Sequence, residues 1–494
     1  MDLLRTRGLR LFSVSAQINQ ALKRAMATMA TASSQTRACQ RNTRVLKVDA
    51  SNIGQIVFNN PQRSFLGDWD IELSETSPDA ANLQEAALQI RNSDIPVAFP
   101  TETVYGLGAD ATRSAAVREI YSAKGRPSDN PLIIHISSLA QLRTLFARRG
   151  KPTVAPEVPL DPIPQIYHPL ISRFWPGPLT ILLPLPTPSP LAPEVTNSLP
   201  TVAVRMPSSI LALMLIKLSN VPLAAPSANA SSKPSPTTAA HVLHDLSGRI
   251  NIILDGGPCN VGVESTVVDG LTNPPVILRP GGVSIDMLRS CPGWDGVAVG
   301  YEDVAETGVP RAPGMKYKHY SPNARVILFH GQMDMVSARK YIGAKRTVGV
   351  VMTKRWQEQI WQLGNSITKN HRISIPNGHA SNGDEVGHLH GETLDPELEA
   401  VDDAQSTLAV NIPSAQYSPF HLNKEDDQDK VDVWTIALGR ITADIARGLF
   451  SALRELDQKG VDVILVEAID EREGDTAAAV MNRLRKAAEA EITL

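Results

Sequence analysis

The stretch NLQEAALQIRNSDIPVAFPTETVYGLGAD, residues 82–110, contains a candidate helix, an apolar extended segment and two glycines in succession. The helical pattern ends at Asp94, and residues 95–104 are apolar enough for a buried strand. Gly106 and Gly108 then stand where a strand of a nucleotide-binding fold turns into a helix. The fold of the first half of the chain therefore depends on what these glycines do.

The glycines match the G-x-G-x-x-A form of a dinucleotide-binding loop, but its other requirements are missing. That motif needs an acidic residue about 20 positions further on, at the end of the next strand. Asp129 has this spacing but precedes the next apolar strand, and the chain contains no G-x-x-x-x-G-K-[ST] phosphate loop. We interpret Gly106 and Gly108 as parts of a tight turn and disfavour a dinucleotide site.

The order of helical and strand-like segments predicts an α/β protein with two domains. Segments alternate over 82–290, too irregularly for a doubly wound repeat, and predict one domain of mixed topology. Residues 291–323 lack periodicity and are interpreted as a linker. A β-α-β pattern over 324–494 predicts a smaller Rossmann-like parallel domain. Its polar, acidic stretch at about 377–430 predicts a disordered loop.

Composition excludes several classes of protein. The 494 residues carry a formal net charge of −3, so no overall basic excess points to nucleic acid. The three cysteines form no C-x-x-C pair, which disfavours a disulfide framework and a zinc site and fits a reducing compartment. No apolar run of about 18 residues occurs, so we expect no membrane span.

The N-terminal segment 1–48 differs from the rest of the chain. It carries nine Lys and Arg residues against one acidic residue, Asp2, and it is rich in serine. This composition is typical of a mitochondrial presequence, and equally of a disordered basic tail. We expect a cytoplasmic protein, with a mitochondrial location for a form that uses this segment as a targeting peptide.

Basic side chains stand at the ends of predicted helices and strands. Lys124 and Arg126 follow a helix, where part of their role is explained by capping. Arg205 and Arg279 each end an apolar strand, and an arginine there needs an anionic partner. A lone histidine such as His135, at the end of another strand, is more often structural than functional.

Hydroxyl groups and small side chains accompany these cations. The loop PLAAPSANASSKPSPT, residues 222–237, lets backbone N–H groups approach phosphates, although it also fits a plain surface loop. No serine, cysteine and histidine set is arranged as a nucleophile. The residues alone predict a pocket that orients highly anionic reactants without a covalent protein intermediate.

Seven motifs in order resemble the YrdC-like threonylcarbamoyl-AMP synthases. They are PTETVYGLGAD, KGRPSDNPLIIHI, FWPGPLTILL, VAVRMP, APSANASSKPSPT, VESTVVD and ILRPGG. The linker stretch APGMKYKHYSP and the ending AAAVMNRLRKAA look like the two-domain form found in fungi and archaea. The resemblance implies a twisted mixed sheet in the first domain, with a concave, positively charged face.

The family makes L-threonylcarbamoyl-adenylate from L-threonine, bicarbonate or carbon dioxide, and ATP, and releases pyrophosphate. The resemblance implies that Mg²⁺ accompanies ATP and that a partner complex transfers the threonylcarbamoyl group to the adenosine beside the anticodon of tRNA. Threonine's amine would capture bicarbonate as a carbamate, which attacks the α-phosphate. No metal site of the protein's own is expected.

The motifs also imply roles for individual residues. The residues expected to contact threonine are Thr103, His135, Arg205, Ala225 and Ser265. The residues expected to bind ATP are Arg126, Asn130, Thr201, Ser227, Ser235, Arg279 and, in the linker, Tyr320, which would close over the nucleotide. Those expected to be catalytic are Lys124, Arg126 and Arg205.

Two other interpretations remain beside this one. A YrdC-like domain could instead bind double-stranded RNA on its basic face, without synthase activity, but a near-neutral net charge argues for weak RNA binding at most. The related domain of hydrogenase maturation proteins comes with zinc-finger segments, which three cysteines cannot form.

Overall fold

The computed structural model describes residues 41–147, 161–301, 319–331, 347–356, 416–423 and 430–493. Within these ranges the strands form sheets of eleven, six and two strands. No helix in the described ranges is long and apolar enough to cross a membrane.

The larger sheet mixes parallel and antiparallel strands, which confirms the mixed topology predicted for the first domain. In order across the sheet its strands are β1 (Arg44–Lys47), β10 (Ile252–Asp255), β4 (Val97–Phe99), β5 (Gly106–Asp110), β9 (Leu223–Ala224), β6 (Ile133–His135), β8 (Thr201–Arg205), β7 (Leu179–Pro184), β11 (Thr266–Asp269), β12 (Val276–Arg279) and β13 (Ala298–Val299). The pairs β10–β4 and β6–β8 are parallel, whereas β5 runs antiparallel to both neighbours. The strand ends that carry His135 and Arg205 therefore lie side by side.

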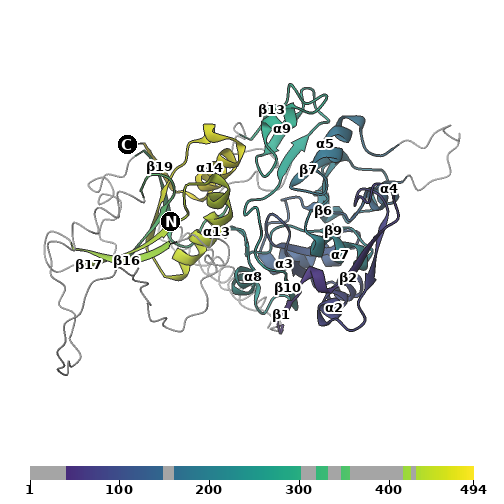
Figure 1. Cartoon of the computed structure of the whole chain (residues 1–494), viewed down its shortest axis with the longest axis horizontal. Helices are drawn as coiled ribbons and strands as arrows, with labels where there is room; N and C mark the ends of the chain where they lie inside the picture. The colour runs from purple at the N-terminus through teal and green to yellow at the C-terminus, as the bar shows by residue number, and fades with distance from the viewer. Residues whose placement is uncertain are drawn as a thin grey trace, which may run out of the picture. The chain divides into compact units, whose positions relative to one another are not determined.

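Helices connect and cover these strands (Figure 1). They are α2 (Pro78–Asn92), α3 (Ser114–Lys124), α4 (Leu139–Phe146), α5 (His168–Phe174), α6 (Pro193–Thr196), α7 (Ile210–Ser219), α8 (Ala239–Leu246) and α9 (Ile285–Arg289). Ser138 caps α4 by accepting a hydrogen bond from the backbone N–H of Gln141, a role that serine commonly has at the start of a helix. α7 is apolar on almost every face because it is buried against α2.

The glycines of the opening stretch lie in a strand, so the prediction of a tight turn at Gly106 and Gly108 is wrong. β4 and β5 pair with Phe99 opposite Gly106, and the chain reverses between them. A Cβ atom at Gly108 would lie 2.6 Å from the ring of Phe99, and one at Gly106 would lie 3.2 Å from it. These positions need glycine because an aromatic ring lies directly against the strand.

The smaller sheet is parallel except at one edge, as expected for the second domain. Its order is β16 (Gln416–Asn423), β17 (Lys430–Ala437), β15 (Thr347–Met352), β18 (Val463–Glu467), β14 (Arg325–His330) and β19 (Ala490–Thr493), and β16 is the antiparallel strand. Its long helices, α13 (Thr442–Gln458) and α14 (Asp475–Ala487), lie together (Figure 1). α13 presents Ile445, Leu449 and Leu453 to the core.

The first domain begins earlier in the chain than the sequence predicts. β1 lies within the segment 1–48, for which the sequence predicts a presequence or a basic tail, yet it pairs with β10 at the edge of the larger sheet. A hairpin of β2 (Gly54–Phe58) and β3 (Trp69–Leu73) also precedes residue 82. The lysine and arginine side chains of an edge strand face solvent, so the pattern of β1 resembles that of a tail.

A strand of the second domain stands where a loop was expected. β16 lies within 377–430, where a loop was predicted, because an edge strand needs only backbone pairing along one side. The basic segment up to residue 40, most of the linker (302–318) and residues 357–415 lie outside the described residues. The predictions for them stay predictions.

Candidate active site

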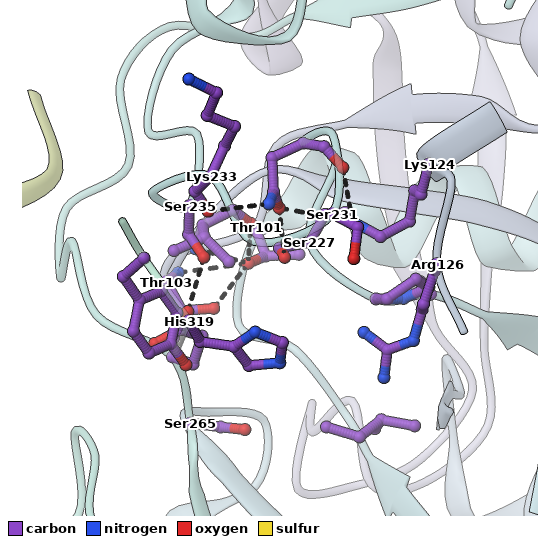
Figure 2. A pocket seen from close by; sticks show the side chains of 18 of the residues that line it. Thr101, Thr103, Lys124, Arg126, Ser227, Ser231, Lys233, Ser235, Ser265 and His319 are labelled. Atoms are coloured by element: carbon purple, nitrogen blue, oxygen red, sulfur yellow. Dashed lines mark hydrogen bonds between the residues drawn. The ribbon is translucent and has the colours of Figure 1, made fainter. Parts of the chain in front are cut away.

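One pocket gathers residues from the ends of strands and helices of the first domain (Figure 2). In the close view, Lys124 and Arg126 lie on one side, and Thr103, Ser235 and His319 lie on the other. Eleven of the sequence-predicted site residues line it, namely Thr103, Lys124, Arg126, His135, Arg205, Ala225, Ser227, Ser235, Ser265, Arg279 and Tyr320. Topology thus brings together residues spread over more than two hundred positions.

Arg205 is held rigidly at the end of β8. Its Nη1 donates to the hydroxyl of Thr103 at 3.0 Å, and its Nε donates to the carbonyl of Gly177 at 3.3 Å. Its Nη2 lies 2.6 Å from Oε1 of Glu102 in a buried ion pair, at an angle that does not make a hydrogen bond. The guanidinium is therefore oriented before any ligand arrives.

His135 lies next to Arg205 in the parallel pairing of β6 and β8. Burial, together with the charge of Arg205, lowers the pKa of His135 to about 3. The imidazole is therefore neutral at physiological pH. Its Nδ1 is buried without a hydrogen-bond partner among the described residues, so it can serve a bound ligand.

Arg126 and Arg279 supply positive charge on other walls of the pocket. Burial lowers the pKa of each to about 10, so both remain cations at neutral pH. Arg126 donates to the carbonyl of Pro131 at 3.2 Å. Arg279 donates through Nε and Nη2 to the backbone and side-chain oxygens of Ser265, at 3.0 and 3.1 Å.

Lys124 has a different geometry from the arginines. It is the last residue of α3, which ends at Gly125 in the left-handed conformation. Its buried Nζ donates to the backbone carbonyls of Ser227 and Asn229 at 2.5 and 2.6 Å. Burial, with the charge of Arg126 next, lowers the pKa of Lys124 well below its usual value. In this structure Lys124 fixes the loop 222–237, and its direct support of phosphates stays a prediction.

Glu264 brings a negative charge into the lining. It accepts a hydrogen bond from the hydroxyl of Ser235 at 2.6 Å and pairs with Arg483 of α14 at 3.0 Å. Burial alone would raise its pKa, but Arg483 and Arg279 outweigh burial and lower the pKa to about 2. Glu264 is therefore ionised.

Tyr320 reaches the pocket from the described end of the linker. It has a left-handed backbone with φ of 70°, and its ring lies 5.1 Å from that of Phe450 in α13. Burial, followed by the negative charge of Glu264, raises the pKa of its hydroxyl to about 12. The hydroxyl is therefore protonated at neutral pH.

Two predicted residues lie outside this lining, although both are described. Asn130 is buried behind Arg126, and its backbone oxygen accepts from the hydroxyl of Tyr121 at 3.0 Å. Thr201 begins β8, at the opposite end of the strand from Arg205. Their predicted contacts with ATP stay predictions.

Sequence reasoning gave no individual role to several other lining residues. They include Thr101, Asn229, Lys233, Glu264 and His319. Each stands within two residues of a predicted site residue, and that proximity is the signal that could have found them. The partner of Glu264 could not be found in this way, because Arg483 is 219 positions away.

Comparisons with known proteins agree with the two-domain architecture. The model of the Sua5, YciO and YrdC family, described as Telomere recombination, matches residues 89–281. The model described as Threonylcarbamoyl-AMP synthase, C-terminal domain, matches residues 283–489.

Relatives match over most of their length. Threonylcarbamoyl-AMP synthase of Schizosaccharomyces pombe is 43% identical over 427 residues, which cover 82% of this chain and 88% of that protein. The synthase of Pyrococcus abyssi is 41% identical and covers 79% of this chain and 89% of its own. The crystal structure of P. abyssi Sua5 complexed with L-threonine has a TM-score of 0.61 at 34% identity, over 92% of this chain and 100% of that one. The chain belongs to the threonylcarbamoyl-AMP synthase family and is an enzyme of its two-domain form.

Proposed function

We propose that the protein makes L-threonylcarbamoyl-adenylate from L-threonine, bicarbonate or carbon dioxide, and ATP, and releases pyrophosphate. The observation that carries this proposal is the convergence of Arg126, Arg205 and Arg279 on one pocket. Three buried guanidinium groups suit reactants that carry a carboxylate and a triphosphate. The name of the S. pombe relative and the threonine complex of P. abyssi Sua5 support the same reaction.

Threonine would bind at the end of the pocket formed by β6, β8 and the β4–β5 loop. Arg205 would pair with the amino-acid carboxylate, and the neutral imidazole of His135 would meet its polar groups without adding charge. Thr103, Ala225 and Ser265 would complete this end of the pocket. A rigid Arg205 costs little ordering free energy on binding.

ATP would occupy the side formed by Arg126, Arg279 and the loop 222–237. Small residues in this loop let backbone N–H groups approach the phosphates, and Lys124 keeps the loop in place. Ser227, Ser235 and Tyr320 would add hydroxyl contacts. Mg²⁺, entering with ATP as part of the substrate, would offset charge on the pyrophosphate.

The chemistry needs no nucleophile from the protein. Threonine's neutral amine forms a C–N bond with the carbon of bicarbonate, and water leaves; with carbon dioxide, only a proton is lost. An oxygen of the resulting carbamate then attacks the α-phosphorus of ATP. The bond from the α-phosphorus to the bridging oxygen breaks, and pyrophosphate leaves. Arginines that hold the reactants in line lower the barrier by positioning and by charge stabilisation. The product would pass to a complex that modifies the adenosine beside the anticodon of tRNA.

The test is an incubation of the full chain with ATP, Mg²⁺, L-threonine and labelled bicarbonate, followed by chromatography. We expect a labelled threonylcarbamoyl-adenylate and an equal amount of pyrophosphate. Omission of threonine should abolish both. Folded protein that releases no pyrophosphate under these conditions would overturn the proposal.

A further inference from the structure

A buried ion pair joins the C-terminal domain to the pocket. Arg483 of α14 is fully buried, and its Nε lies 3.0 Å from Oε2 of Glu264. Its Nη1 donates to the carbonyl of Pro280 at 2.5 Å. Arg483 therefore contacts the residue two positions before β11, Glu264, and the residue directly after β12, Pro280. Arg483 itself is not among the residues that line the pocket.

Glu264 places a full negative charge in a pocket proposed to take a triphosphate. Its carboxylate accepts a hydrogen bond from Ser235, and its charge raises the pKa of the Tyr320 hydroxyl. Both residues line the same pocket. It also lies near Arg279, the cation expected to hold ATP, and the two charges interact. An uncompensated carboxylate at this point would repel phosphate groups and draw Arg279 toward itself.

From this geometry we infer that Arg483 is a positioning residue for ATP, acting through Glu264. It neutralises the carboxylate, so that Glu264 orients Ser235 while the charge of Arg279 stays directed at the nucleotide. The inference rests on the proposed function. It gives the second domain a part in the active site, although no residue of α13 or α14 lines the pocket.

The central experiment compares Arg483→Met with a rescue variant. KM values for ATP and for threonine are measured by pyrophosphate release, and binding of the analogue α,β-methylene-ATP is measured by calorimetry. In Arg483→Met we expect the KM for ATP to rise about tenfold or more, equivalent to about 1.4 kcal/mol, with the KM for threonine changed less than about threefold. Adding Glu264→Gln should return the KM for ATP toward that of the wild type, because the uncompensated charge is gone.

The rescue separates the inference from the alternatives. If Arg483 attracted ATP directly, Glu264→Gln would not restore binding. If the ion pair served only the fold, Arg483→Met would lower the melting temperature and leave the KM for ATP unchanged. Either result would overturn the inference. Arg483→Lys retains the charge and provides a milder variant if Arg483→Met does not fold.

Arg485→Met is the matched control. Arg485 lies on the same helix but pairs with Glu471 and Glu491 at the surface, so both KM values should stay as in the wild type. A wild-type chain without activity would instead count against the proposed function. In that case the calorimetric comparison still tests Arg483, and unchanged binding of the analogue by Arg483→Met would reject its role.

Discussion

At the scale of single residues, Gly108 shows how a glycine can be required by packing alone. Its Cβ would meet the ring of Phe99 at 2.6 Å and the side chain of Leu223 at 3.3 Å, and both neighbours are fully buried. We therefore expect Gly108→Ala to lower the free energy of unfolding by about 1–3 kcal/mol, measured by urea denaturation. Gly296→Ala, where nothing lies within 4 Å, should change it by no more than about 0.5 kcal/mol. Equal effects at the two positions would contradict the packing explanation.

Removal of the Arg205 side chain should weaken the binding of threonine much more than the binding of ATP. Loss of a charge-assisted contact with a carboxylate costs about 1.5–3 kcal/mol, so Arg205→Ala should raise the KM for threonine by about 10- to 100-fold. The KM for ATP should change far less. Because the substitution also leaves Glu102 without its partner, Arg205→Lys serves as a charge-retaining comparison. Equal losses for threonine and ATP would refute the assigned role.

At the scale of elements, the parallel pairing of β6 and β8 sets the titration of His135. The strands bring it beside Arg205 in a buried position, and burial followed by that charge lowers its pKa to about 3, below the usual 6.5. Between these values the unfolded chain binds a proton that the native chain does not, so stability falls as the pH drops from about 6.5 toward 3. Thermal unfolding of His135→Asn should show a shallower loss across this window than the wild type. If stability falls equally with pH in His135→Asn and in the wild type, His135 is not the cause of the pH dependence.

At the scale of the whole molecule, the two sheets are tied by buried charge pairs as well as apolar contacts. Arg454 of α13 lies 2.8 Å from Asp245 of α8, and both side chains are almost fully buried. Burial alone would raise the pKa of Asp245, but the pairing with Arg454 outweighs burial and lowers this pKa to about 2. Removing one partner leaves a buried charge, so Arg454→Met should lower the free energy of unfolding by about 3–5 kcal/mol. Adding Asp245→Asn to Arg454→Met should restore part of the lost free energy of unfolding. Denaturant unfolding of the wild type, the two single variants and the double variant measures the coupling energy between Arg454 and Asp245. If the two substitutions change the free energy of unfolding additively, the pair is not coupled.

Much of the architecture could be predicted from local patterns, because most of the strands and helices carry their own periodicity and caps. The helical pattern that ends at Asp94 corresponds to α2, and the apolar segment 95–104 contains β4. The predictions failed where local chemistry does not determine the outcome. β1 has the composition of a tail but pairs at a sheet edge, and Gly106 and Gly108 resemble a turn but lie under an aromatic ring.

The sequence by itself determined the fold class, the family and the residue types that the pocket needs, since these follow from motif order and from charge at strand ends. Only the tertiary structure decided what those residues do. In the structure Lys124 donates hydrogen bonds to backbone carbonyls of the loop 222–237, and Arg205 forms an ion pair with Glu102. It also brings Arg483 to Glu264 from the far end of the chain. The physical reason is that a buried charge must find a partner, and the partner is chosen by proximity in space, which no local pattern records.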